Sequence, residues 1–429
     1  MNIRIWPWFL LVLALIPALL INSPKTQVKG LGSRSNTIVE AIYQMPGNLD
    51  PALATTPSEW QVIDNVFEPL LTETPQGQVV PAAASLVTMS GNTVTVKVGN
   101  HRLSNGQPLT AFAAAGALDR PLLPPVNSKT ASNLLSEVVG YHALMSGHQN
   151  FLSGIKVLNS NTFTITLKHP ATLGFLRNLA NPTLSLVPLA DQQHGGANWQ
   201  FTNLIGTGGY ALTGWVPGDH LTFKRVAGFG PSNVTLAYYS TFQLALLGFL
   251  NHIITVLPVP VDQIAGMKHS LQHRVHFLST PGSLALYLRS TTHGVSAYPA
   301  LAPVSTWVHD AFSGREASMG QNWPSGLPTG RPMTVWVNSQ DSAAVRLAST
   351  LAKLTKGKVT VQEGTSAQIH AAATAGSISA YLGTQAWFKT GTRVTLARRG
   401  NFWLWSSDIT GAEAYANGGL DWHTITFRN

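Results

Sequence analysis

Beyond Ile21, the chain contains no apolar run that approaches the roughly 20 residues needed to span a bilayer. Yet 44% of its residues are hydrophobic and only 10% are charged, so most apolar side chains must be buried in folded cores. A chain of 429 residues is too long to fold around a single hydrophobic core of ordinary size, and its length suits two lobes of roughly 150 to 200 residues each. The sequence therefore predicts a large globular body that is soluble outside its N-terminal segment.

The N-terminal segment has the pattern of an export signal. Trp8 to Ile21 form a 14-residue apolar stretch, and polar residues follow from Asn22 to Lys25. This length is typical of a secretory signal and short for a membrane-spanning helix. We expect residues 1–36 to be a signal peptide, or an uncleaved signal anchor that holds the protein at the membrane, followed by a polar linker. A buried N-terminal helix is the alternative.

Composition excludes several classes of protein. The chain has no cysteine, so disulfides, thiolate metal sites and cysteine nucleophiles are excluded. The net charge is +9, but the basic residues are scattered and their longest cluster is Arg398-Arg399. We therefore expect no nucleic-acid partner. The positive charge reflects a shortage of acids, with 18 Asp and Glu against 27 Lys and Arg, which suits an acidic exterior or an anionic membrane surface.

The first half of the chain alternates strand and helix patterns. Thr37 to Tyr43 reads as a strand, and Ser58 to Leu71 reads as a helix with Ser58 as its N-cap. Alternating residues at Thr93 to Val98 and at Thr162 to Leu167 predict further strands, the second preceded by a tight turn at Asn159 to Asn161. The pattern predicts an α/β protein with a β-rich part.

A βαβ unit is predicted in the second half. Met333 to Val337 reads as a strand, Asp341 to Leu354 as an amphipathic helix, and Lys358 to Gln362 as the next strand. A strand, helix and strand in this order place two parallel strands in one sheet.

Seven motifs, in order along the chain, resemble those of one family. The first is a "tLDP"-like turn and the last is a "GTGPY"-like strand entry. In order they are Asn48–Pro51, Asn65–Leu71, Gln78–Ser85, Asn92–Val98, Arg102–Ala111, Ile155–Pro170 and Ile205–Asp219. The family is the family 5 extracellular solute-binding proteins, which includes the oligopeptide-, dipeptide- and nickel-binding components of ABC importers. The resemblance covers residues 37 to 429.

The resemblance implies an α/β, two-lobe, periplasmic-binding-protein-like fold of type II, with a β-rich extra subdomain in lobe I. Residues 37–250 would form lobe I, with 393–429 returning to it, and residues 251–392 would form a trimmed lobe II, since the chain between Arg289 and Pro332 is shorter than the family norm. The implied function is capture of a peptide or other small ligand in an interlobe cleft, outside the cytoplasmic membrane, and its delivery to the permease subunits of an ABC transporter, with no cofactor.

Candidate ligand contacts follow from the same resemblance. Trp387 matches a pocket position of the family, and Tyr43, Gln44 and Asn48 lie where the first strand opens towards the family's cleft. Trp60 follows on the next helix. A core position for Trp387, and turn or helix packing for the others, are the alternatives.

The chain also departs from the family pattern. Gly209 stands where the family motif has proline, and Phe112 stands where acidic residues are usual. After Trp387, the aspartate that holds the α-ammonium group of a peptide in oligopeptide binders is missing. Lys389 and Arg393 stand there instead, and if they face the cleft they would favour a carboxylate or phosphate group on the ligand. Solvated loop cations are the alternative.

No enzymatic machinery is visible. The sequence has no G-x-S-x-G elbow, no H-E-x-x-H helix and no P-loop. Gly206 to Ala211 formally matches G-x-G-x-x-A, but strand and turn residues follow where a dinucleotide fold demands a helix. The carboxylates of Asp50, Glu68 and Asp219 lie in motifs where structural hydrogen bonds are the default interpretation. We expect no catalytic residues and no enzyme.

A histidine cluster leaves a metal site open. His269, His273 and His276 are spaced by four and then three residues, which on a helix would bring their imidazoles to one face. Val275 to Leu278 reads as a strand, however, so we expect the helix to end before His276. A second functional hypothesis is a degenerate, membrane-tethered binding lobe that acts as a sensor or interaction module.

Overall fold

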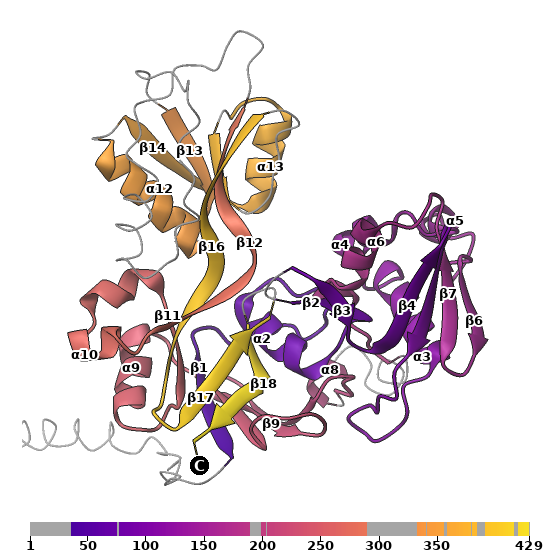
Figure 1. Ribbon diagram of the computed structural model, residues 1–429, viewed down its shortest axis with the longest axis horizontal. Coiled ribbons are helices and arrows are strands. Elements are labelled where there is room, and N and C mark those ends of the chain that lie inside the picture. The colour runs from indigo at the N-terminus through magenta and orange to yellow at the C-terminus, as the bar shows by residue number, and fades with distance from the viewer. Residues whose placement is uncertain are drawn as a thin grey trace, which may run out of the picture. The chain divides into compact units, whose positions relative to one another are not determined.

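A mixed sheet of ten strands runs through the part of the chain that the structure describes (Figure 1). The structure is a computed structural model that describes residues 36–74, 77–188, 199–202, 204–289, 333–339, 341–355, 358–378, 380–383, 391–415 and 419–428. In spatial order the ten strands are β14 (Val359–Gly364), β13 (Met333–Asn338), β15 (Ala380–Gly383), β12 (His276–Arg289), β16 (Gly391–Trp405), β11 (Val256–Val259), β1 (Thr37–Ile42), β10 (Asn233–Tyr238), β9 (His220–Arg225) and β8 (Tyr210–Val216).

The longest pairing in this sheet joins β12 and β16. The two strands run antiparallel from His276↔Trp403 to Arg289↔Gly391, with register shifts near Ser279. At one end β16 also pairs with β11, and at the other β12 also pairs with β15. This ribbon therefore connects the strands that begin the chain with the later group of β13, β14 and β15 (Figure 1).

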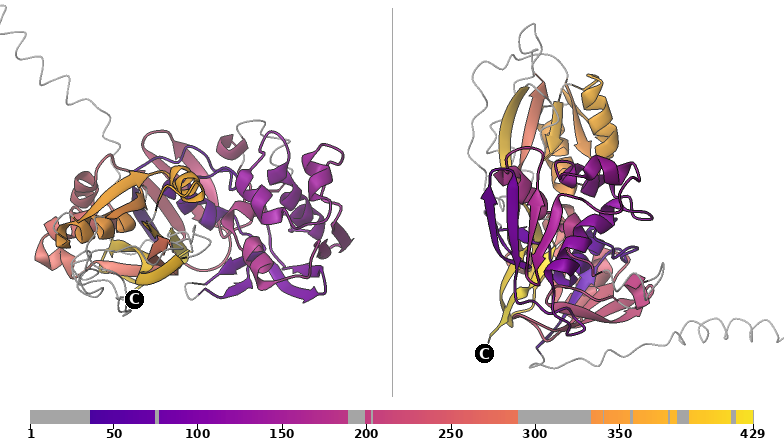
Figure 2. Two further views of the ribbon diagram at one scale, coloured as in Figure 1. Left: turned by 90° about the horizontal axis from the view of Figure 1, so that it is seen from above. Right: turned by 90° about the vertical axis from the view of Figure 1, so that its right-hand side faces the viewer.

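A separate antiparallel sheet of four strands forms the β-rich part of the fold. Its order is β4 (Ala84–Ser90), β5 (Thr93–Val98), β7 (Thr162–Thr166) and β6 (Ile155–Asn159). Figure 2 shows helices on one face of this sheet, among them α3 (Ala111–Asp119), which contacts β5, β6 and β7. Two hairpins complete the described strands, β2 (Leu71–Glu73) with β3 (Val79–Pro81) and β17 (Ile409–Ala414) with β18 (Leu420–Phe427).

The remaining helices are short, and most begin at a capping side chain. Thr110, Ser128, Thr172 and Thr241 each accept a hydrogen bond from the third helical residue, which satisfies a donor that the helix itself leaves free. The helices beyond α3 are α2 (Pro57–Val66), α4 (Lys129–Leu135), α5 (Tyr141–Met145), α6 (Leu173–Leu179), α8 (Trp199–Thr202), α9 (Phe242–Leu250), α10 (His269–Gln272), α12 (Ser342–Leu354) and α13 (Ser366–Thr374), with 3-10 turns at Arg120–Leu122, Pro182–Leu184 and Val261–Gly266.

Helix α2 both begins and ends earlier in the sequence than predicted. Its N-cap is Thr56, not Ser58, because Thr56 and Glu59 form a reciprocal capping box and Pro57 occupies the first turn. It ends at Val66, where Phe67 adopts an extended conformation. The prediction had extended the helix to Leu71 across Pro69, a residue that cannot donate in a helix interior.

The predicted βαβ unit is confirmed. β13 and β14 pair in parallel from Met333↔Val359 to Asn338↔Gly364, and α12 connects them. Asp341 caps α12, since its side chain accepts a hydrogen bond from the backbone N–H of Ala344 at 3.0 Å. The mixed α/β class predicted from the sequence is therefore confirmed.

Three large cores stabilise these layers. One, around Phe163, lies between the four-stranded sheet and its helices. A second, around Val335 and Leu347, joins α9, β11, β13 and α12. A third joins Ile38 of β1 with α2, with β8 to β10 and with Trp422 of β18, so the C-terminal hairpin packs against the first strand of the domain. The predicted bounds of the two lobes stay a prediction.

Within the described residues, no helix has the length and apolar character needed to cross a membrane. The apolar stretch from Trp8 to Ile21 lies outside the described residues.

Candidate ligand-binding region

The segment between β1 and α2 contains three of the predicted ligand residues, beginning with Tyr43. Its side chain is half-buried and packs against the core around Val335. Its hydroxyl donates a hydrogen bond to the carbonyl oxygen of Pro258 on β11, at 2.5 Å, and burial raises the pKa of the phenol above its usual range. The hydroxyl of Tyr43 thus ties the residue after β1 to β11.

Gln44 is exposed, whereas Asn48 and Trp60 are half-buried. The side-chain oxygen of Asn48 accepts a hydrogen bond from the backbone N–H of Asp50 at 2.7 Å, which is the geometry of an Asx turn. Trp60 lies on α2 and packs against the core around Ile38. The structure therefore places Tyr43, Gln44 and Asn48 on one segment and Trp60 on the next helix, and their contact with a ligand stays a prediction.

The other predicted ligand residues belong to the last third of the chain. Trp387 and Lys389 lie outside the described residues. Arg393 is on β16, where its backbone pairs with that of Tyr287; its side chain is outside the described part. β16 meets β11 only at Phe402 and beyond, nine residues further on, which corresponds to roughly 30 Å of strand. The backbone of Arg393 is therefore separated from the strands beside β1 by this length of β16.

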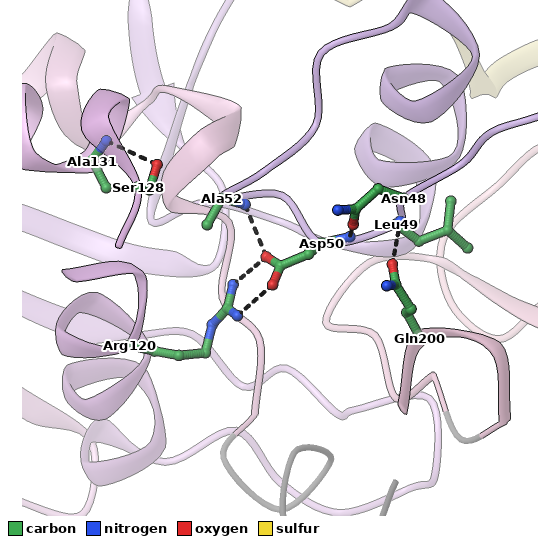
Figure 3. Close-up of polar contacts among 8 residues, drawn as sticks. All are labelled: Asn48, Leu49, Asp50, Ala52, Arg120, Ser128, Ala131 and Gln200. Carbon is green, nitrogen blue, oxygen red and sulfur yellow. Dashed lines mark hydrogen bonds and ion pairs between the residues drawn. The ribbon is translucent and has the colours of Figure 1, made fainter. Parts of the chain in front are cut away.

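A buried ion pair between Asp50 and Arg120 also anchors the segment between β1 and α2. Asp50 and Arg120 are each 4% exposed, and the guanidinium of Arg120 donates two hydrogen bonds to the carboxylate, at 2.8 and 2.6 Å (Figure 3). The same carboxylate accepts the backbone N–H of Ala52 at 2.9 Å. Asp50 therefore connects the segment after β1 to the end of α3, and its predicted structural role is confirmed.

A second junction brings together three motifs that are far apart in the sequence. The backbone of Gly206 exchanges hydrogen bonds with Ser104, at 3.0 and 2.9 Å, and Gly208 donates to the carbonyl of Val66 at 2.8 Å. The hydroxyl of Thr207 accepts the backbone N–H of Glu68 at 2.9 Å. β8 begins directly after this junction, at Tyr210, so the G-x-G-x-x-A match opens a strand, as expected, and not a nucleotide-binding helix.

The two glycines of this junction allow backbones to meet closely. A Cβ atom at Gly206 would lie 2.0 Å from the carbonyl oxygen of Val66, and one at Gly208 would lie 2.8 Å from that of Asn65. We expect Gly206→Ala to destabilise the protein by about 3 kcal/mol, because backbone atoms must move. Urea unfolding would measure the change. Gly266→Ala is the control, since nothing lies within 4 Å of that position, and equal effects of the two substitutions would contradict the proposed close approach.

The departure at Gly209 has a physical cause. A Cβ atom there would lie 1.9 Å from the Cε1 atom of His423, and the ring of His423 also contacts Tyr210, with centroids 5.0 Å apart. His423 belongs to β18. The imidazole thus occupies the space that a proline ring would need, so the glycine of the strand-entry motif and the histidine of the C-terminal hairpin fit each other.

The C-terminal hairpin is attached to α2 by buried amide groups. Gln61 donates to the carbonyl of Leu420 at 3.0 Å and accepts its N–H at 2.6 Å, while Asn65 donates to the same carbonyl at 3.0 Å. Trp422 donates through its backbone to Asn65 at 3.1 Å, and its indole donates to the carboxyl of Glu40 at 2.7 Å. Glu40 is 1% exposed, and burial raises its pKa to about 8.

Further buried carboxyls lie near this hairpin. Burial, together with the nearby charge of Asp421, raises the pKa of Glu68 to about 7. Burial also raises the pKa of Asp421 itself. Glu68 contacts His101 at 3.4 Å. Both carboxyls therefore keep a proton to a higher pH than free carboxyls do.

Arg120 also lines a small cavity of about 190 Å³. Its lining includes Asp119, Leu123 and Asn150, and none of the predicted ligand residues. The backbone N–H of Leu152 donates to the carboxyl of Asp119 at 2.9 Å, and burial raises the pKa of that carboxyl to about 6. The cavity is too small for a peptide, given the several hundred Å³ that ligand sites occupy.

The histidine cluster divides into two parts. α10 ends at Gln272 with His273 as its C-cap, and His276 begins β12, so the prediction that the helix stops before His276 is confirmed. His276 stacks on Trp405, with ring centroids 3.8 Å apart. Among the described residues, no group of three or more His, Asp or Glu side chains could hold a metal ion.

Sequence reasoning did not find the partners of the buried charges. Nothing in the sequence connects Asp50 with Arg120, 70 residues away, or Glu40 with Trp422, 382 residues away. The one available signal for such a buried charge was Glu40 itself, because a glutamate is unusual within a strand whose other central residues are apolar.

Comparison with known proteins finds a partial match to one family. Residues 78–269 match the family described as bacterial extracellular solute-binding proteins, family 5 Middle. The probable deoxycholate-binding periplasmic protein YgiS of Escherichia coli K12 is 26% identical over 238 residues, which cover 53% of this chain and 44% of YgiS. The periplasmic murein peptide-binding protein MppA of the same strain is 29% identical over 180 residues, which cover 41% of this chain and 33% of MppA. The matched part thus spans less than half the length of either relative.

Solved structures share the fold over nearly the whole chain. The unliganded open form of MppA superposes with a TM-score of 0.69 at 16% identity, covering 92% of this chain and 98% of that chain. Haemophilus influenzae OppA in complex with the peptide RPPGFSPFR gives a TM-score of 0.62 at 15% identity, covering 92% and 99%. At these identities the likeness concerns the fold. Residues 78–269 thus resemble the family 5 bacterial extracellular solute-binding proteins, and the chain shares the fold of solved periplasmic binding proteins.

Proposed function

We propose that this protein is the extracytoplasmic solute-binding component of an ABC importer, and that it captures a peptide or another small carboxylate-bearing ligand. The observation that carries the proposal is the coincidence of the family match over residues 78–269 with a fold shared over 92% of the chain. The relatives named above are periplasmic, which supports export of residues 37–429 and the use of the N-terminal segment as a signal or anchor. The partners would be the permease subunits of the importer.

The proposed division into lobes rests on the sheet. Residues 37–250 with 393–429 would form lobe I, and residues 251–392 would form lobe II. The packing of β17 and β18 against β1 and α2 supports the return of the chain to lobe I. The long ribbon of β12 and β16 would then be the connection about which the lobes close on a ligand.

The ligand chemistry is proposed from the segment after Trp387. Without an acidic side chain there, an α-ammonium group would lose a charge-assisted hydrogen bond worth roughly 1.5 to 3 kcal/mol. Lys389 and Arg393 would instead favour a carboxylate, with Trp387, Tyr43, Gln44, Asn48 and Trp60 supplying the remaining contacts. Both a peptide and deoxycholate, which the names of the two relatives mention, carry such a group.

Isothermal titration calorimetry with chemically matched ligands would test this. The probes are di- to pentapeptides in three forms, unmodified, N-acetylated and C-amidated, together with deoxycholate. We expect C-amidation to weaken binding by roughly tenfold or more and N-acetylation to change it little. Arg393→Ala and Lys389→Ala should reproduce the effect of C-amidation, whereas Lys97→Ala, an exposed position on β5, should not.

Two outcomes would contradict different parts of the proposal. A large preference for a free amino terminus would show that an acidic anchor exists and that the carboxylate preference is wrong. Absence of binding to every probe, in a protein that unfolds cooperatively, would favour the alternative of a membrane-tethered sensor or interaction module.

A further inference from the structure

Two exposed histidines on one helical turn point their ring nitrogens at each other. The Nε2 atoms of His269 and His273 are 2.8 Å apart, the separation of a hydrogen bond in which one ring donates and the other accepts, and their rings are nearly perpendicular, with centroids separated by 4.2 Å. His269 begins α10 and His273 is its C-cap, so the spacing of four residues places both side chains on the same side of this turn. Both side chains are exposed, so an ion or its complex would reach them from solvent.

The third histidine of the cluster takes no part in this pair. His276 is on β12 and stacks flat on Trp405, at an interplanar angle of 4°. The cations next to the pair in sequence are Lys268 and Arg274. Arg274 donates a hydrogen bond to the carbonyl of Trp405 at 3.1 Å and lies over the ring of Phe249, so its guanidinium already has contacts of its own.

A bound ion would replace this hydrogen bond and set the separation of the two nitrogens itself. Imidazole nitrogens bind late transition ions at about 2.0 to 2.1 Å. Two ligands at 90° to each other, as in a square-planar or octahedral ion, would then have nitrogens about 2.9 Å apart, whereas tetrahedral ligands would be about 3.3 Å apart. The two nitrogens already lie close to these separations, and rotations of the exposed rings would let both lone pairs point at one ion.

We propose that His269 and His273 form an exposed two-imidazole site for a divalent late transition ion, with Cu²⁺ and Ni²⁺ preferred to Zn²⁺. Square-planar and tetragonal nitrogen sites select Cu²⁺ or Ni²⁺, and the two protein ligands leave the other positions to water or to a chelating molecule. The ion would bind α10 and not the segment that carries Tyr43, so this site is independent of the ligand proposed above.

Titration of the full chain with CuCl₂, NiCl₂ and ZnCl₂ would test the site. We expect calorimetry at pH 7.5 to show one class of binding site that takes one ion per protein, with affinity decreasing in the order Cu²⁺, Ni²⁺, Zn²⁺. The electron paramagnetic resonance spectrum of bound Cu²⁺ should show nitrogen ligands. His269→Asn and His273→Ala should each weaken this class by roughly tenfold or more, because the second imidazole binds intramolecularly once the first is in place. Binding should also weaken at pH 5.5, since protons compete for both nitrogens.

The variant His276→Gln distinguishes a site made by His269 and His273 alone from a site that uses all three histidines. It should leave ion binding unchanged, because the ring of His276 is stacked on Trp405. Unchanged affinity in His269→Asn and His273→Ala would overturn the proposal and assign the ion to other groups of the chain. Equal loss in all three variants would contradict a two-imidazole site and favour a three-histidine one. Circular dichroism of each variant would confirm that it is folded.

Discussion

Asp50→Ala is expected to destabilise the folded protein by about 3 to 5 kcal/mol. The substitution leaves the guanidinium of Arg120 buried without its carboxylate partner, and such an unpaired charge costs far more than the pair contributes. The backbone N–H of Ala52 also loses its acceptor. Equilibrium unfolding in urea, with the slope checked against that of the wild type, would measure the loss.

The double variant Asp50→Ala with Arg120→Met supplies the control. We expect it to be more stable than the sum of the single changes predicts, by about 1 to 3 kcal/mol, because no charge remains buried. The exposed pair of Glu137 and His169, at 2.7 Å, offers a comparison. Glu137→Gln should leave the unfolding midpoint unchanged, and strictly additive effects at Asp50 and Arg120 would contradict the proposed coupling.

The protein is expected to be more stable at pH 5 than at pH 8. The pKa of Glu40 is about 8 in the folded state against 4.5 ordinarily, because its carboxyl is buried. A carboxyl with a raised pKa contributes stability that is fully present below its unfolded pKa and is lost as pH rises through the folded value. The loss amounts to on the order of 1 kcal/mol for each pH unit between about 4.5 and 8.

Other buried carboxyls act in the same direction. The pKa of Glu68 is raised to about 7 and that of Asp119 to about 6, so each adds to the loss of stability over the lower part of this range. The pKa of Asp421 is raised as well. A stability profile of this kind suits an acidic exterior, which was one interpretation of the shortage of acidic residues.

The variant Glu40→Gln tests whether Glu40 causes the expected loss of stability as the pH rises. The amide keeps an oxygen that accepts from both Trp422 and Gln61, which donate to Glu40 at 2.7 and 3.1 Å, but it cannot ionise. We expect thermal or urea unfolding between pH 4.5 and 8.5 to show a shallower decline in this variant. Glu363→Gln, at an exposed position on β14, should retain the wild-type profile. A wild-type protein that gains stability up to pH 8 would contradict the prediction.

The helices and strands whose formation depends on residues adjacent in the sequence could be predicted from the sequence. β5 has its predicted bounds, since alternation of Thr with Val leaves one apolar face. α12 follows the predicted strand because Asp341 caps it and its apolar residues recur at helical spacing. The order of the motifs from Asn48 to Asp219 was sufficient to indicate the family, because each motif is a local turn, strand or helix end.

What the sequence left undetermined involves residues that meet only after folding. The capping box of Thr56 and Glu59 was within reach of sequence rules, yet Ser58 competed for the same role. The fit of Gly209 to His423 and the pairing of Asp50 with Arg120 have no local signal, since van der Waals contact and charge pairing depend on distance in space and not along the chain. By itself the sequence determined the α/β class and the end of the helix before His276, because local periodicity and capping decide these, and its motifs were sufficient to show a resemblance to one family. Only the tertiary structure decided which polar groups are buried, and with which partners, because burial and the resulting pKa shifts arise from packing between distant segments.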